Sequence, residues 1–484
     1  MLGTPAPSVS LRPPRYSDSR NYFFHSPVDG PPKEAIESLQ NQIDFHVGEA
    51  NRLRYAQNLH VAVSRLPAEL LVEAFLYVVE SGLQDDNARF TVGTFSFLQV
   101  CRRWNEVAVG FPQLWSWWVA GGFKAWPIFN SRSKNVPILL AWRHRTPAST
   151  LDVLTDPAIP KRLRQLDFGG TSNQLQHLLG ALESSPPSNA SSVQIQIFPH
   201  EYREPQAHLV RFLSSPFPKL SRLDLASFLP DCSSPIFTTS RLTSLKLFLP
   251  FGKGGRYTLS QFSHILRRHP SLRELELNHG AIPLPELSGS PPVSFTLPQL
   301  VTLRLYGAEA DILGFLDLTG MSSPLHDVVV RFGRPSYFHA PALASTVKKV
   351  LVAYYECQGL GHHRRVSHIT ISCDPDKNHI SFNTRCHPVP TSDLRCNLKI
   401  QFNEVCEPDR NAMVKETFPL FPLDDVRGFA LEGSVLYADV SQHVFRMMKN
   451  LSHLRLDDVD LWLALEILSP SGPGMFRAVD KKPC

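Results

Sequence analysis

The sequence predicts an α + α/β protein, in which a small helical domain is followed by an irregular solenoid, a horseshoe with a parallel sheet on its concave face. Two helical patterns and a tryptophan-rich segment, between residues 61 and 122, predict the helical domain. Beyond residue 160 the pattern L-x-x-L-x-L recurs with a mean spacing of about 29 residues, which predicts the solenoid. One strand and one helix cannot close a core alone, whereas stacked neighbours can.

Composition places the chain among ordinary intracellular proteins. Of the 484 residues, 43% are hydrophobic and 19% are charged, and the net charge of +5 gives no bias toward nucleic acid. No apolar run reaches the ~18 residues that span a bilayer, and the first residues lack the apolar middle of a secretory signal. The eight cysteines contain no C-x-x-C pair. We therefore expect a cytoplasmic or nuclear protein that binds neither membranes nor nucleic acid.

The N-terminal region divides into a tail and a helix. Residues 1–32 are rich in proline, serine and arginine, which predicts disorder, and residues 33–60 predict an amphipathic helix. Its apolar residues at three-, four- or seven-residue steps are Ile36, Leu39, Ile43, Ala50 and Leu53. This helix either packs on the next domain or pairs as a coiled coil. The first interpretation is favoured, because His46 and Gly48 interrupt the apolar seam.

The stretch RLPAELLVEAFLYVVE, which begins at Arg65, predicts a helix that is apolar nearly all round. Pro67 suits its first position. At 100° per residue, Glu69, Glu73 and Glu80 occupy a stripe only about 40° wide, and apolar residues fill the rest. A helix of this kind must be covered on more than one side.

A second, one-sided helix is predicted over FLQVCRRWNEVAV, from Phe97. A polar insert at about residues 81–94 precedes it, and the apolar segment FPQLWSWWV follows it. Residues 123–160 are expected to form a linker.

Residues 161–484 carry the repeats, which begin with LRQLDF and include LTSLKL, LRELEL and LVTLRL. Each hexamer predicts a strand with alternate residues buried, and the stretches between them predict helices. The central apolar residues are Leu166, Ile195, Leu223, Leu245, Leu275, Leu303, Val328, Ile369, Ile400, Phe429 and Leu454.

The order RLPAELLVEAF, FLQVCRRWNEVA and PQLW resembles the F-box domain, in a form common in large fungal families. With the leucine-rich-repeat-like array behind it, the chain resembles an F-box protein. The resemblance implies a non-enzymatic substrate-recognition subunit of a cullin-RING (SCF-type) ubiquitin ligase, acting in ubiquitin-dependent protein degradation. Its F-box would bind a Skp-family adaptor, and through it a cullin, while the repeats bind an unknown protein substrate. The alternative is a ligase-independent scaffold built on the repeats.

Position by position, the resemblance implies adaptor-facing residues in the helical domain: Leu66, Pro67, Leu70, Leu71, Phe75, Val100, Cys101, Trp104 and Trp115. Each could instead belong to the domain's own core. The 81–94 insert departs from the family pattern. It is either a tolerated surface loop or an element that displaces the second helix and weakens docking.

Residues between the buried leucines of each strand should face the concave side. Their charges alternate in sign, which favours a protein ligand of mixed character over nucleic acid. The candidate substrate-binding residues combine aromatic and charged side chains: Lys246, Phe248, Glu276, Arg304 and Tyr306.

No pattern of catalytic or metal-binding residues stands out. The cysteines from Cys373 to Cys406 lack the spacing of roughly two to four residues that structural zinc ligands show. Neither a phosphate-binding loop nor G-x-S-x-G or H-E-x-x-H is present. We expect no enzyme activity, no metal and no cofactor.

Overall fold

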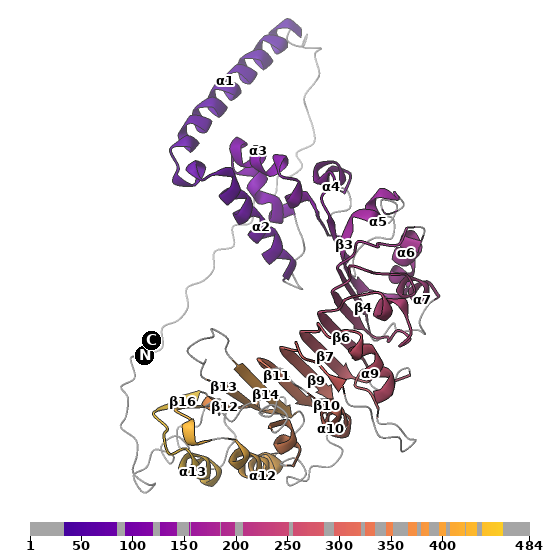
Figure 1. Cartoon of the computed structure of the whole chain (residues 1–484). Helices are drawn as coiled ribbons and strands as arrows, with labels where there is room; N and C mark the ends of the chain where they lie inside the picture. Colours follow the sequence, from indigo (N-terminus) through magenta and orange to yellow (C-terminus); the bar gives the residue numbers. More distant parts are fainter. Residues whose placement is uncertain are drawn as a thin grey trace, which may run out of the picture.

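A computed structural model gives the arrangement of the chain (Figure 1). It describes residues 33–84, 92–119, 126–142, 154, 156–183, 185–198, 207–250, 255–284, 295–320, 325–333, 345–351, 366–374, 379–386, 396–402, 407–421, 423–432 and 438–457. These form a mixed α/β structure, in which a group of helices precedes a large and mostly parallel sheet. The predicted disordered tail lies outside the described residues.

The helices before the sheet are α1 (Lys33–Leu59), η1 (Ala62–Arg65), α2 (Ala68–Gln84), η2 (Val92–Gln99), α3 (Arg102–Gly110) and η3 (Pro112–Trp115). The second predicted helix therefore begins five residues later than Phe97. Cys101 has an extended backbone (φ −159°, ψ 166°), which separates the 3-10 turns of η2 from α3. None of the described helices is long and apolar enough to cross a membrane.

The described strands form a 14-stranded sheet with the order β1-β2-β3-β4-β5-β6-β7-β9-β11-β14-β13-β12-β15-β16. Its strands are β1 (Trp117–Val119), β2 (Ile138–Trp142), β3 (Leu163–Gly170), β4 (Ser192–Ile197), β5 (Arg222–Ala226), β6 (Ser244–Leu249), β7 (Glu274–His279), β9 (Thr302–Gly307), β11 (Asp327–Phe332), β12 (Val366–Asp374), β13 (His379–Cys386), β14 (Cys396–Phe402), β15 (Gly428–Glu432) and β16 (His453–Asp457). All neighbours are parallel except the pairs β12–β13 and β13–β14.

Helices lie along the outer side of the arc of strands in Figure 1, and the opposite side of the sheet, here called the open face, carries none of the labelled helices. The outer helices are α4 (Trp126–Ser133), α5 (Ala158–Arg162), α6 (Ser172–Glu183), α7 (Ala207–Leu213), α8 (Pro235–Thr238), α9 (Leu259–Arg267), α10 (Glu309–Leu318), α12 (Glu407–Thr417) and α13 (Ala438–Met447). Many of their apolar residues, such as Phe262 and Phe315, are fully buried.

Two rows of apolar side chains run across the strands and make the core between sheet and helices. The first row is Trp118, Leu140, Leu166, Val193, Leu223, Leu245, Leu275, Leu303, Val328 and Leu398. The second is Trp142, Phe168, Ile195, Leu225, Leu247, Leu277, Leu305, Val330 and Ile400. Each of these residues is buried, so parallel pairing in register aligns the hexamers one above the next.

Serine and threonine side chains reinforce the start of each strand. Ser221 donates its hydroxyl to the carbonyl of Ser191, and Thr243 donates to that of Ser221. The backbone N–H groups of the same two residues donate to the same two carbonyls. In these two hexamers the short polar residue at the second position thus adds a side-chain hydrogen bond to a carbonyl that the backbone already pairs.

Three predictions about the order of elements were wrong. Residues 126–142, placed in a linker, form α4 and β2 and extend the sheet. In two hexamers the residue predicted to be central was wrong by two positions. Val193, rather than Ile195, aligns with Leu166. Leu398, rather than Ile400, aligns with Val328. The strand that contains Ile369 does not lie beside the strand that contains Val328, as their order in the sequence suggests. β14 pairs with β11, and β12 lies two strands beyond β14.

The amphipathic helix of residues 33–60 exists as α1, but it does not pack on the helices that follow. In Figure 1 it projects away from α2 and α3, and its main neighbour is η1, the turn directly after it. Its apolar side chains are exposed in consequence.

Replacing Leu245 with alanine tests the importance of the buried rows. Leu245 is fully buried between Leu223 and Leu275, so Leu245→Ala should lower the free energy of unfolding by ~2–5 kcal/mol. Urea denaturation followed by circular dichroism measures this change. Val210→Ala on the exposed part of α7 is the matched control, and an equal loss in both variants would contradict the assignment.

Candidate functional site

The helix α2 has three sides that differ in their surroundings. Its glutamates Glu69, Glu73 and Glu80 are exposed along one stripe, as their spacing predicts. Opposite them, four apolar residues are buried: Leu71, Val72, Phe75 and Val79. One side of the helix is therefore covered by the chain itself.

A second apolar side of α2 is uncovered in the described structure. It consists of Leu70, Ala74, Tyr77 and Val78, and is here called the α2 face. Leu70 is 47% exposed, Tyr77 72% and Val78 44%. At 100° per residue these four side chains span about a quarter-turn next to the buried side. The helix thus exposes as broad an apolar arc as it buries, which is unusual for an isolated surface helix.

An aromatic cluster beneath α2 holds the helices in place. The ring of Phe75 stacks on Phe97 of η2, with centroids 4.4 Å apart, and lies 5.2 Å from the ring of Trp104 on α3. Trp115 donates its indole N–H to the carbonyl of Ala108 at 2.8 Å. Such a packed cluster fixes the position of α2, and with it the direction of the α2 face.

The start of α2 is also joined to the start of α3. The Arg103 guanidinium donates a hydrogen bond to the backbone carbonyl of Leu66, just before Pro67. This bond brings the residues around Leu66 close to the turn at Val100 and Cys101.

The nine residues expected to face an adaptor divide into three groups. Leu71, Phe75 and Trp115 are buried in the core, so their side chains are not at the surface. Leu66, Cys101 and Trp104 are half-buried. Pro67, Leu70 and Val100 are exposed.

Two residues of the α2 face, Tyr77 and Val78, were not among the predicted adaptor-facing residues. Their position beside Leu70 on a helical wheel could have identified them. Of the 81–94 insert, residues 81–84 belong to α2 and residues 92–94 to η2, while residues 85–91 lie outside the described residues.

On the open face, three of the predicted substrate-binding residues share one row. Lys246 on β6, Glu276 on β7 and Arg304 on β9 are cross-strand neighbours. The same row continues to Asp224 on β5. Acidic and basic side chains therefore alternate along this row of neighbouring strands, as the sequence predicts.

These charges neutralise one another. Lys246 contacts Glu274 at 2.8 Å and Glu276 at 3.9 Å, and Arg304 contacts Glu276 at 3.8 Å. Arg304 also contacts Asp327 at 3.0 Å. All are partly exposed, so each pair adds little to stability on its own. The network leaves few free charges for a ligand in this part of the row.

The two aromatic candidates lie in the next row. Phe248 and Tyr306 flank Asn278, and both are half-buried. The ring of Phe248 meets that of His279 edge-on at 5.6 Å, and the Arg331 guanidinium lies 5.1 Å from the centroid of Tyr306. Aromatic rings held in this way next to a neutralised ionic network form a rigid surface with both apolar and polar parts.

Asp224 differs from the other charges of its row. Its carboxylate forms no ion pair with a described residue, and burial raises its pKa to about 6, while the positive charge of Lys246 acts in the opposite direction. It lines a hollow of about 600 Å³ on the open face, together with residues that include Gln194, Arg222 and Arg273. The alternation of buried and exposed residues along β5 places Asp224 on this face. The burial of its carboxylate and its lack of an ion pair with a described residue follow from the folded sheet and could not be read from the sequence.

No family model and no curated protein matches this chain. Among the described residues, no group of three or more histidine, cysteine, aspartate or glutamate side chains could hold a metal ion.

Replacing Asp224 with asparagine should change how stability depends on pH. The carboxyl group has an ordinary pKa of 3.8 and a folded-state pKa of about 6, so between these values the folded state binds more protons. Its unfolding free energy therefore falls as pH rises through this window. We expect Asp224→Asn to be more stable than the unchanged chain by ~1–2 kcal/mol at pH 7, after allowance for partial exposure, and equal to it at pH 4.

Thermal unfolding of both proteins at pH 4 and pH 7 measures this difference. Glu416→Gln, an exposed site on α12, is the control. A stability difference that is the same at both pH values would contradict the assignment.

Proposed function

We propose that this chain is an F-box protein, the substrate-recognition subunit of a cullin-RING (SCF-type) ubiquitin ligase. In this proposal α2, η2, α3 and η3 form the F-box, and the α2 face docks on a Skp-family adaptor. The strand–helix units form a leucine-rich-repeat solenoid whose open face binds a protein substrate. The chain itself performs no chemistry.

The exposed α2 face is the observation that carries the proposal. It begins within RLPAELLVEAF, one of the three segments that resemble the F-box, continues to Val78, and presents an apolar arc that the described part of the chain does not cover. Apolar surface of this kind on a soluble protein indicates a binding site for another protein. The half-buried Leu66 and Cys101 and the exposed Val100 would extend it at the junction of α2 and α3.

The open face supports the second half of the proposal. A row of mutually paired charges beside Phe248 and Tyr306 offers aromatic contact area and polar groups together, as protein interfaces do. The sequential strands also present this surface as one continuous strip across the sheet.

The alternative is a scaffold that binds proteins through the open face without any ligase. It leaves the α2 face without a role. Deleting residues 61–119 would be a poor way to separate the two functions, because the buried Trp115 and Trp118 belong to the same core as the first strands of the sheet. Single surface substitutions avoid this problem.

Leu70→Asp tests the adaptor site. A charge placed in a covered apolar contact costs several kcal/mol, so co-purification with a Skp-family adaptor should fall by about 100-fold or more. Val210→Asp on α7 is a matched control, because Val210 is 52% exposed and lies far along the chain from α2.

If the unchanged chain does not associate with a Skp-family adaptor, the receptor function is wrong. If Leu70→Asp and Val210→Asp bind equally well, the α2 face is not the docking site.

The double variant Phe248→Ala, Tyr306→Ala tests the open face. It should lose a protein partner captured by the unchanged chain, since truncation of central aromatic contacts typically costs ~2 kcal/mol or more. Its adaptor binding should stay unchanged. Quantitative mass spectrometry of proteins bound to each variant measures both effects, and retention of every partner would exclude these rings from the binding site.

A further inference from the structure

The helix α1 presents an apolar seam that none of the described residues cover. Along 27 residues, about 40 Å, its main neighbour in the chain is η1. Ile36, Leu39, Ile43 and Leu53 are all between 53% and 63% exposed, and Ala50 is exposed as well. Figure 1 shows α1 apart from both α2 and the sheet.

The seam follows a heptad. With Ile36 as position a, the a positions are Ile36, Ile43 and Ala50, and the d positions are Leu39, His46 and Leu53. This pattern runs from Ile36 to Leu53, about two and a half heptads, and Gln57 holds the next a position of α1. His46 is the single polar residue within it, and a lone polar residue in a seam fixes register at some cost in stability.

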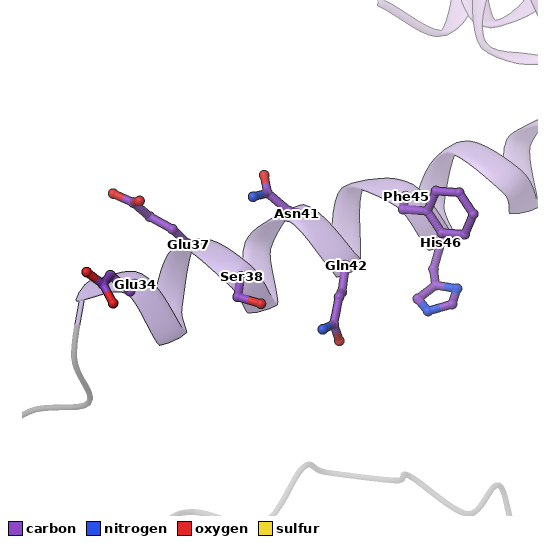
Figure 2. A pocket seen from close by; sticks show the side chains of 7 residues that line it. All are labelled: Glu34, Glu37, Ser38, Asn41, Gln42, Phe45 and His46. Carbon is purple, nitrogen blue, oxygen red and sulfur yellow. The ribbon is translucent and has the colours of Figure 1, made fainter.

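The other side of α1 does not compete as a binding surface. Figure 2 shows the residues around a shallow hollow of about 500 Å³ on α1. They are mostly polar and, apart from His46 at a d position, lie off the seam: Glu34, Glu37, Ser38, Asn41, Gln42, Phe45 and His46. Phe45, at position c, is exposed but lies off the seam. The apolar residues of the heptad therefore decide where a partner helix would pack.

The charges beside the seam distinguish the two orientations of a pair of identical helices. In a parallel pair, Glu49 at position g faces Arg54 at position e of the other helix, twice, and these are opposite charges. In an antiparallel pair that overlaps the same apolar residues, Lys33 would face Arg54, which are like charges. Arg54 forms no ion pair with a described residue, whereas Glu49 contacts Arg52 of its own helix at 3.0 Å.

We propose that α1 pairs with α1 of a second copy of this chain, as a parallel two-stranded coiled coil. The occupant of the seam is an identical seam, so identical residues meet in each layer, and they are apolar in every layer from Ile36 to Leu53 except that of His46. The dimer does not depend on the α2 face, and it would place two open faces in one assembly.

Sedimentation equilibrium of the full chain tests the proposal. The unchanged chain should be a dimer at micromolar concentration. Ile43→Asp should raise the dissociation constant by about 100-fold or more, because it places two charges in one seam layer. Phe45→Asp is the matched control, since it adds the same charge two residues away at a more exposed position off the seam, and it should stay dimeric.

A charge reversal tests the orientation. Glu49→Arg should weaken the dimer, and adding Arg54→Glu in the same chain should restore it, because both chains then carry the reversed pair. Oxidative cross-linking of Ala50→Cys should give a covalent dimer above the level of the unchanged chain, since Ala50 faces itself only in the parallel pair.

A monomeric unchanged chain, or a dimer that survives Ile43→Asp, would overturn the proposal. Failure of the double charge reversal together with no gain in cross-linking would overturn the parallel orientation. These outcomes are independent of ligase function, because Ile43→Asp should leave adaptor co-purification unchanged and Leu70→Asp should leave the dimer intact.

Discussion

The in-register pairing of two buried apolar rows is the constraint on which the rest of this structure depends. Each of the strands β2–β7, β9, β11 and β14 contributes two apolar side chains to the rows, and no strand–helix unit can bury them without its neighbours. The same pleat sends the residues between them to the open face. Burial of Leu245 and Leu247, for example, places Lys246 and Phe248 on that face. The residues of the open face, the proposed binding surface, are therefore placed by the same alternation that builds the core.

Much of this arrangement could be predicted from the sequence, because alternation with period two specifies which residues a strand buries. The errors arose where that signal is ambiguous. In SVQIQI both Val193 and Ile195 are buried, so the hexamer alone does not reveal which one aligns with Leu166. The strands from Val366 to Phe402 include antiparallel pairs, and their order depends on contacts between distant residues that no local pattern encodes.

The candidate sites were predictable to different degrees for a similar reason. A helical wheel shows that α2 has more apolar surface than one core needs, but it does not say which arc the chain covers. Leu70 and Leu71 are the same residue type, yet Leu71 is buried in the core that includes Phe75 and Phe97, while Leu70 is 47% exposed. On the open face, the row from Lys246 to Arg304 could be foreseen. Its mutual neutralisation could not, because ion pairing depends on side-chain positions across three strands.

The tryptophans between the helices and the sheet have a mechanical consequence. Trp115 ends η3, Trp118 lies on β1 with its indole N–H donated to the carbonyl of Trp115, and the ring of Trp118 packs 5.4 Å from that of Trp126. All three are buried in one continuous core. Among the described residues, the helices that carry the α2 face and the first strands of the sheet therefore share one packed core at this junction. Partners bound to the α2 face and to the open face would be held on a single body, so a change in the tryptophan packing would alter their relative orientation.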